Sequence, residues 1–225
     1  ATATETTTTT AAPQLEQLGI TSFTSAGGGW LTAFHDAARF YCQDQGIDVN
    51  VFGNEQSTSK QISDIKKMVN QGFDGIAANV WETDGANAAI EEADAAGIPV
   101  FTVNADASTE AVTMNIAFAS EEISYHAGQK LVEFMREQKP DLDEYRVLNV
   151  RGALIQEGDL RSEGFKRAVD EHDDVVLADT INGKFQHQEG LKQAQQWFNA
   201  NEPVDGFYSA NITMELGVLD ALDRE

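Results

Sequence analysis

The sequence contains a single cysteine, Cys42, few basic residues and no long apolar run. One thiol cannot form an internal disulfide, and it excludes zinc or iron–sulfur sites that need several cysteines. No apolar run approaches the roughly 18 residues of a membrane-spanning helix. The first residues carry neither the basic nor the apolar segment of a signal peptide. The 15 Lys and Arg against 37 Asp and Glu give a net charge of −22, so we expect no binding to nucleic acid or anionic lipid.

Motifs of catalysis and of cofactor binding are also scarce. The triplet Gly27–Gly29 follows a predicted strand, but a dinucleotide loop needs a further glycine where Thr32 stands. No GxxxxGKS or GxxxxGKT phosphate loop occurs, and the segment around Ser25 lacks the first glycine of a hydrolase nucleophile elbow. The four histidines lie far apart without metal-ligand spacing. We therefore expect no catalytic residue, no metal site and no cofactor, and hence a protein that is not an enzyme.

The acidic residues are spread along the chain instead of gathered in one tail. Two interpretations compete: an ordinary acidic protein, or a halophilic protein in which salt screens the repulsion between its many surface carboxylates. The apolar pattern stays intact while the exposed positions are acidic, which favours the halophilic interpretation.

Residues 1–14 are dominated by threonine and contain no large apolar side chain. Such a segment buries too little apolar surface to offset the entropy lost on ordering. We expect residues 1–14 to form a flexible Thr-rich tether between a surface anchor and a folded body. The alternative is a cloning remnant or a frayed terminus.

Predicted strands and helices alternate from residue 20 onward. Strands are expected at 20–25, 49–52, 75–80, 99–104, 112–118, 145–150, 175–180 and 206–210. Helices are expected at 30–45, 57–71, 84–96, 120–138, 159–171, 187–200 and 214–222. This alternation predicts an α/β protein whose parallel sheets are covered by helices on both faces. We expect two similar lobes, at 15–118 and 119–225, with ligand residues just after the strands.

The first predicted helix shows the spacing of a one-sided apolar face. Its apolar residues recur at intervals of three and four, as Leu31, Phe34, Ala38 and Tyr41. Cys42 lies on the apolar side of this helix, so we expect it to pack as a small buried hydrophobic side chain.

Four further segments follow one another in a characteristic order. Residues 62–76 read ISDIKKMVNQGFDGI, and residues 84–100 read DGANAAIEEADAAGIPV. Residues 161–165 read RSEGF, and residues 214–219 read MELGVL. Together, from about residue 20 to the last residue, they resemble the ribose-type periplasmic sugar-binding proteins, the substrate-binding components of sugar ABC importers. The same fold serves the effector domains of LacI-type repressors.

The resemblance implies ligand residues in the first lobe. In this family the first strand ends in a small polar residue, and an aromatic pair stands at the first helix; Ser25 and Trp30 match, and Leu31 replaces the second aromatic. The family has Asp-Arg after the fourth strand, where this chain has Asn104 followed by alanine. We expect Asp106 to supply the missing carboxylate.

The resemblance implies three further ligand residues in the second lobe. Arg161 matches the family's second-lobe arginine, and Phe185 matches an aromatic residue in a loop. Asn211 matches the asparagine before the last segment, although Ile212 replaces the aspartate that follows it in the family. Flat rings can cover the C–H faces of a sugar, and planar polar groups can each bond two neighbouring hydroxyls. Core packing of the rings and a surface ion pair for the arginine are the alternative interpretations.

The expected function is ligand capture for transport. The resemblance implies an extracytoplasmic solute-binding protein that captures a sugar or related polyol between two lobes and delivers it to an ABC permease. We expect the lobes to close around the ligand. We also expect a monomer, located outside the cell or in the periplasm and tethered like a lipoprotein through residues 1–14.

Two alternatives keep the same fold. One is the effector-binding core of a LacI-type transcription regulator, which would need a basic helix-turn-helix that this sequence does not show. The other is a receptor for a sugar-like autoinducer. Members of the family continue past the segment at 214–219 with further strands, so we expect a second lobe that is incomplete relative to the family.

Overall fold

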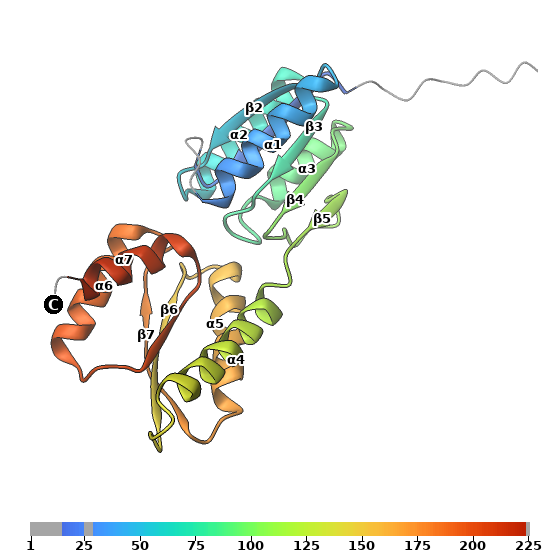
Figure 1. Cartoon of the computed structure of the whole chain (residues 1–225). Helices are drawn as coiled ribbons and strands as arrows, with labels where there is room; N and C mark the ends of the chain where they lie inside the picture. The colour runs from blue at the N-terminus through green and yellow to red at the C-terminus, as the bar shows by residue number, and fades with distance from the viewer. Residues whose placement is uncertain (1–14, 25–28, 224–225) are drawn as a thin grey trace, which may run out of the picture.

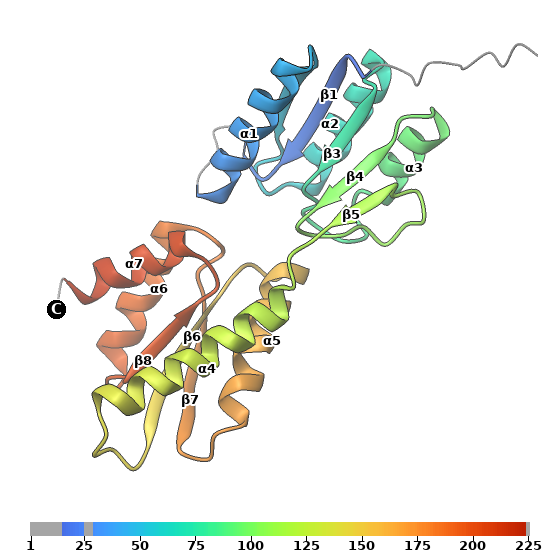
Figure 2. The ribbon, with the colours of Figure 1, turned by 45° about the vertical axis from the view of Figure 1, so that its right-hand side comes forward.

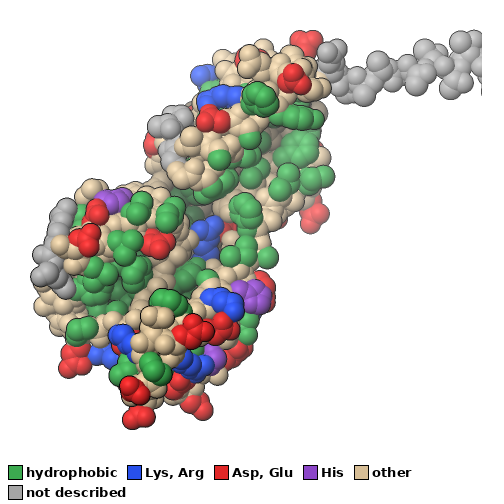
Figure 3. Space-filling model, in the orientation of Figure 1, with side chains coloured by type: hydrophobic (Ala, Val, Ile, Leu, Met, Phe, Trp, Pro, Cys, Tyr) green, Lys and Arg blue, Asp and Glu red, His purple; other side chains and the backbone are tan. Residues whose placement is uncertain are grey.

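The computed structural model describes residues 15–24 and 29–223. The predicted tether at 1–14 and the predicted ligand residue Ser25 lie outside these residues. The described chain forms two α/β lobes (Figure 1), which meet across a furrow in the space-filling view (Figure 3). All strand pairs among the described residues are parallel, as the alternation of strands and helices predicts. None of the helices in this part of the chain is both long and apolar enough to span a bilayer.

The first sheet contains five strands in the order β2-β1-β3-β4-β5. They are β1 (Gln17–Ser22), β2 (Asp48–Gly53), β3 (Gly75–Ala78), β4 (Val100–Val103) and β5 (Met114–Ile116). Helix α1 (Trp30–Asp44) covers one face, and α2 (Thr58–Gln71) and α3 (Asn87–Ala95) cover the other (Figure 2). Because the strands are parallel, their carboxyl ends lie at one edge of the sheet, which faces the second lobe (Figure 1).

Helix α2 shows how local sequence and packing agree in this lobe. On its apolar side, Ile65 and Met68 are fully buried against the sheet, and Ile62 and Val69 are partly buried. The helix begins after Ser57, whose hydroxyl accepts a hydrogen bond from the Lys60 N–H at 3.3 Å. It ends at Gly72, whose left-handed φ of 71° suits glycine.

The second sheet contains three strands in the order β7-β6-β8. They are β6 (Tyr145–Arg151), β7 (Val175–Asn182) and β8 (Gly206–Ser209). Helices α4 (Ser120–Gln138) and α5 (Gln156–Asp170) cover one face, and α6 (His187–Ala200) and α7 (Ile212–Leu222) cover the other (Figures 1 and 2). The smaller second sheet agrees with the expected incomplete lobe. Residues 117–119 join β5 to α4 and so connect the lobes.

Close helix packing stabilises the second lobe. A Cβ atom at Gly164 of α5 would overlap the Glu121 carbonyl oxygen of α4, so glycine lets the two helices approach. The neighbouring Phe165 has no exposed surface and stacks on Tyr208 of β8, with ring centroids 4.6 Å apart and planes 10° apart. This stack joins α5 to β8, one of the two edge strands of the sheet.

Several predicted element boundaries were wrong by a few residues. Helix α5 begins at Gln156 instead of 159, because the Asp159 N–H already donates a helical hydrogen bond to the Ile155 carbonyl. Helix α3 begins at Asn87 instead of 84, because residues 82–87 form tight turns closed by hydrogen bonds to residues 82 and 84. Strand β5 is shorter than predicted, because it pairs with the four-residue strand β4 over three positions.

The buried side of α1 also differs from the prediction. Tyr41 is 69% exposed, and the buried residues are Leu31, His35 and Cys42. Leu31 belongs to both sets, whereas His35 and Cys42 each lie one residue, or about 100°, around the helix from the predicted Phe34 and Tyr41. A polar histidine therefore occupies a position that the apolar pattern could not assign. The predicted burial of Cys42 is confirmed.

Candidate ligand-binding site

A cavity of about 440 Å³ lies between the two lobes, beside the carboxyl ends of strands from both sheets. Its described lining residues are Phe23, Thr24, Gly29, Trp30, Leu31, Glu55, Gln56, Asn104, Glu157, Arg161, Phe185, Gln186, His187, Asn211, Ile212 and Thr213. Loops at the carboxyl ends of parallel strands are where α/β folds bind ligands. The size and the mixture of aromatic and polar groups suit a small molecule.

The first-lobe wall is built by the start of α1 and the residue after β4. Trp30, the first residue of α1, is 38% exposed, and its ring centroid lies 6.2 Å from that of Phe118 in the connection between the lobes. Asn104 follows β4 with a left-handed φ of 69°, which asparagine tolerates better than most residues. Its buried Oδ1 has no hydrogen-bond partner among the described residues. A ligand hydroxyl could satisfy this acceptor.

Arg161 dominates the second-lobe wall. Its Nη1 donates a hydrogen bond to the Ala210 carbonyl at 2.6 Å, and its Nη2 lies 3.3 Å from the Glu157 carboxylate. The guanidinium also lies over the Phe185 ring, 5.9 Å from the centroid. These contacts fix the plane of the guanidinium, and its other N–H groups can donate hydrogen bonds to a ligand.

Phe185 and Asn211 complete this wall. Phe185 follows β7 with a left-handed φ of 60°. A Cβ atom at Gly152, just after β6, would overlap its ring, so this glycine makes room for the aromatic side chain. Asn211 caps α7, and its Oδ1 accepts a hydrogen bond from the Met214 N–H at 2.9 Å. The amide nitrogen of Asn211 is then the group that can donate to a ligand.

Six of the eight predicted ligand residues line this cavity. They are Trp30, Leu31, Asn104, Arg161, Phe185 and Asn211. The structure places Asp106 elsewhere: its carboxylate accepts hydrogen bonds from the Thr102 hydroxyl at 2.9 Å and the Ala107 N–H at 2.8 Å. It holds the loop after β4 together and is absent from the lining. Ser25 lies outside the described residues.

Other lining residues were not predicted. Glu55 and Gln56 follow β2, and Gln186 follows β7, so the rule that ligand residues come just after strands could have found them. Glu157 was missed because the predicted start of its helix lay two residues later. Its acidic side chain resembles the many solvent-facing ones of this chain, and only the packing around it shows that it is buried.

Two matched loops close one side of the cavity. In the loop after β2, the Asn54 side chain accepts a hydrogen bond from the Gln56 N–H, and in the loop after β7 Asn182 accepts one from the Lys184 N–H, both at 2.9 Å. The two loops meet where Gln186 Nε2 donates to Gln56 Oε1 at 2.8 Å. This hydrogen bond joins the lobes directly.

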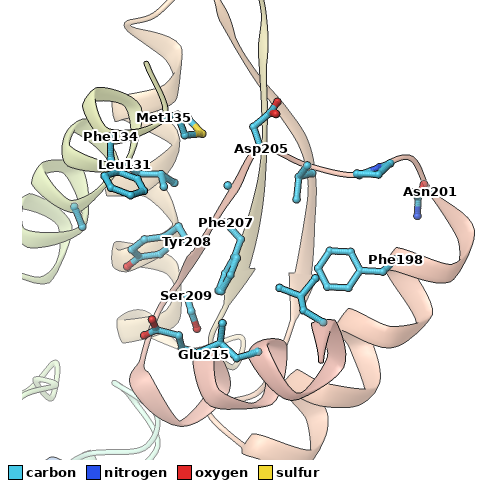
Figure 4. Close-up of a pocket in the computed structure, with 16 residues that line it drawn as sticks. Leu131, Phe134, Met135, Phe198, Asn201, Asp205, Phe207, Tyr208, Ser209 and Glu215 are labelled. Carbon is cyan, nitrogen blue, oxygen red and sulfur yellow. The ribbon is translucent and has the colours of Figure 1, made fainter. Parts of the chain in front are cut away.

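A second cavity, of about 660 Å³, lies on the second lobe along β8 (Figure 4). Leu131 and Phe134 of α4 line one side, and Phe198 of α6 lines the other. The carboxylate of Asp205 is engaged by Lys139 Nζ at 2.7 Å and by the Arg146 N–H at 2.8 Å. This mainly apolar lining offers a hydroxylated ligand few partners, so the inter-lobe cavity is the stronger candidate.

A buried histidine lies on α1, one turn after Leu31 of the cavity lining. His35 is 2% exposed, with Nε2 2.9 Å from the Ser22 Oγ. Because the Ser22 hydroxyl donates its proton to the Thr24 carbonyl, it accepts from the histidine. Burial lowers the pKa of His35, the charge of Arg39 lowers it further, and Asp36 opposes them. The folded protein therefore favours the neutral ring.

This environment predicts an acid-sensitive first lobe. With the folded pKa below the ordinary value of about 6.5, the stabilisation from neutral His35 is fully present above that pH and is lost as pH falls through the folded pKa. We expect the melting temperature to fall between pH 7 and pH 5, and His35→Gln to flatten this dependence. His126→Gln, at a side chain that is 68% exposed, is the control. An unchanged slope in His35→Gln would contradict the prediction.

Comparison with known proteins places this geometry in context. The chain is 25% identical over 180 residues to the ribose import binding protein RbsB of Bacillus subtilis, which covers 80% of this chain and 56% of that protein. It is 25% identical over 218 residues to the xylitol-binding protein of Mycolicibacterium smegmatis, covering 95% of this chain and 60% of that protein. The chain thus spans less than two thirds of the length of these relatives.

Solved structures share the fold. A galactofuranose-binding protein superposes with a TM-score of 0.85 at 19% identity, covering 93% of this chain and 71% of that one. An ABC transporter solute-binding protein from Bacillus halodurans with bound myo-inositol gives a TM-score of 0.81 at 20% identity, covering 96% and 73%. The family model described as a periplasmic binding protein domain matches residues 19–225. The chain therefore belongs to the periplasmic binding protein domain family.

Proposed function

We propose that this chain binds a sugar or polyol between its two lobes and delivers it to the permease of an ABC importer. The observation that carries the proposal is the inter-lobe cavity, in which Trp30 of one lobe and Phe185 of the other line the same space. Asn104, Arg161 and Asn211 add planar hydrogen-bonding groups to that lining. Flat rings suit the C–H faces of a sugar, and planar polar groups suit its hydroxyls. The names of the curated relatives, for ribose import and for xylitol binding, support this ligand class.

The proposed mechanism is closure of the lobes around the ligand. A ligand that contacts both walls binds the closed form more tightly than the open form, and this difference in affinity drives closure. The hydrogen bond between Gln56 and Gln186 would add to the closed state, and residues 117–119 would act as the hinge. The permease would then recognise the closed form.

The setting of the protein is part of the proposal. We place it outside the cytoplasmic membrane, as a monomer tethered through the Thr-rich residues 1–14. The net charge of −22 suits a medium of high salt, where surface carboxylates repel one another less. The curated relatives are import binding proteins, which favours this role over the core of a transcription regulator or an autoinducer receptor.

A thermal-shift panel tests the proposed function. Pentoses, hexoses, polyols and nucleosides are added to the protein in molar salt, and one class should raise the melting temperature. A ligand at a hundred times its dissociation constant should raise it by roughly 5–10 °C. Isothermal titration should then give one site per chain. If no sugar or polyol stabilises the protein while an ester or phosphate is turned over, the proposal is wrong.

A pair of aromatic variants ties any such shift to the cavity. Trp30→Ala removes the first-lobe ring from the lining and should abolish most of the thermal shift. Phe40→Ala changes a side chain of the same helix that is 80% exposed and absent from the lining, so it should leave the shift unchanged. An equal loss in both variants would show that the shift does not report on this site.

A further inference from the structure

Glu157 is a buried carboxylate in the wall of the ligand cavity. It lies in the first turn of α5 and is 3% exposed. Its Oε2 accepts a hydrogen bond from the Ser120 hydroxyl at 2.7 Å and lies 3.3 Å from Arg161 Nη2, one turn further along the helix. Burying a carboxylate is costly unless it is paired and hydrogen-bonded, and both partners are present here.

The charges around the cavity leave no excess of positive charge. The described lining residues include two carboxylates, Glu55 and Glu157, and one guanidinium, that of Arg161. The remaining basic group, His187, lies 3.0 Å from the Asp220 carboxylate. An anionic ligand would therefore lose its hydration and meet an arginine whose charge is already compensated.

The hydrogen-bonding groups of the cavity point in the same direction. The Asn104 Oδ1 is a buried acceptor without a partner among the described residues, so it needs a donor. Two of the contacts of Arg161 are already made, to the Ala210 carbonyl and to Glu157. A ligand hydroxyl can donate to an acceptor such as the Asn104 Oδ1, whereas a carboxylate or a phosphate dianion cannot.

We propose that Glu157 is a specificity-determining residue that makes this site select neutral hydroxylated ligands and reject the corresponding sugar acids. By pairing with Arg161, it orients the guanidinium for hydroxyl oxygens and cancels the charge that would otherwise attract a carboxylate. The inference rests on the proposed function, and it adds which chemical form of the ligand is accepted. It predicts a latent acid-binding site that appears when the Glu157 charge is removed.

The test compares matched neutral and acidic ligands. Dissociation constants are measured by isothermal titration for D-ribose against D-ribonate and for xylitol against D-xylonate. Molar salt screens the general repulsion between these anions and a chain of net charge −22, so that local selection remains. In whichever of these pairs the protein binds, we expect the wild type to bind the neutral ligand at least about tenfold more tightly than the corresponding acid.

Two variants then separate charge from structure. Glu157→Gln keeps the shape of the side chain and removes its charge, and it should shift the acid-to-neutral affinity ratio toward the acid by about tenfold or more. Ser120→Ala removes the hydroxyl partner of Glu157 without changing any charge, so it should leave the ratio unchanged. If Glu157 had a purely structural role, Glu157→Gln and Ser120→Ala would each weaken binding of the neutral and of the acidic ligand by the same factor.

The outcomes distinguish this inference from the proposed function. If the wild type binds an acid as tightly as its neutral counterpart, the inference is overturned, whether or not Glu157→Gln folds. If Glu157→Gln folds and its ratio stays at the wild-type value, the inference is also overturned. If no sugar or polyol of the thermal-shift panel binds at all, it is the proposed function that has failed.

Discussion

Replacing Arg161 by methionine should weaken binding of the sugar or polyol by about a hundredfold. Hydrogen bonds from a charged group contribute roughly 1.5–3 kcal/mol each, and the loss of about 2.7 kcal/mol corresponds to that factor. Methionine keeps much of the apolar length of the side chain, so the wall of the cavity stays filled. Isothermal titration with the ligand found in the thermal-shift panel measures the effect.

The same substitution also affects stability, and a second variant separates the two effects. Without Arg161, the carboxylate of Glu157 remains buried and unpaired, which costs about 3–5 kcal/mol of unfolding free energy. Adding Glu157→Gln removes this uncompensated charge, so the double variant should regain stability without regaining affinity. Urea unfolding and titration of both variants test this separation.

A matched control lies on the same helix. Arg167 of α5 is 41% exposed and pairs with Glu121 and Glu122 at 2.6 Å, away from the cavity. Arg167→Met should change affinity by less than about twofold, since exposed ion pairs contribute little. If the dissociation constant of Arg161→Met stays within about threefold of the wild-type value, this arginine does not contribute to ligand binding.

Phe165→Ala should destabilise the second lobe by about 3–5 kcal/mol. The side chain has no exposed surface, packs in the core with Val147 and Val169, and stacks on Tyr208. The substitution removes this packing and leaves a cavity that the surrounding helices can fill only in part. Urea unfolding followed by tryptophan fluorescence and circular dichroism measures the loss.

The control for this prediction is another phenylalanine of the same lobe. Phe134 on α4 is 58% exposed, so Phe134→Ala should cost less than about 1 kcal/mol. A loss below about 1 kcal/mol in Phe165→Ala would mean that the α4–α5 interface does not depend on the buried ring.

Local patterns predicted most of the elements correctly. Helices α4 and α6 have the predicted limits, 120–138 and 187–200, and the strands alternate with helices as expected. These features depend on residues close together in the chain, above all on the apolar spacing that distinguishes helices from strands. The family resemblance singled out Trp30, Arg161 and Asn211, which line one cavity in the structure.

Two features of the site escaped the sequence analysis, one with local partners and one with a distant partner. Asp106 was expected to supply the carboxylate that the family has after its fourth strand, but it accepts a hydrogen bond from the Thr102 hydroxyl, four residues earlier in the chain. The inter-lobe hydrogen bond of Gln56 links it to a residue 130 positions away, which no local spacing reveals.

The sequence by itself determined the α/β class, the parallel strands and the strong negative charge, because these depend on local propensity, apolar periodicity and composition. Only the tertiary structure decided which polar groups share the inter-lobe cavity and which are occupied elsewhere. Glu157 illustrates the reason: in the sequence it is one carboxylate among many, and its burial beside Arg161 and Ser120 follows from the docking of α4 against α5. Desolvation and pairing of a charge depend on its three-dimensional neighbours.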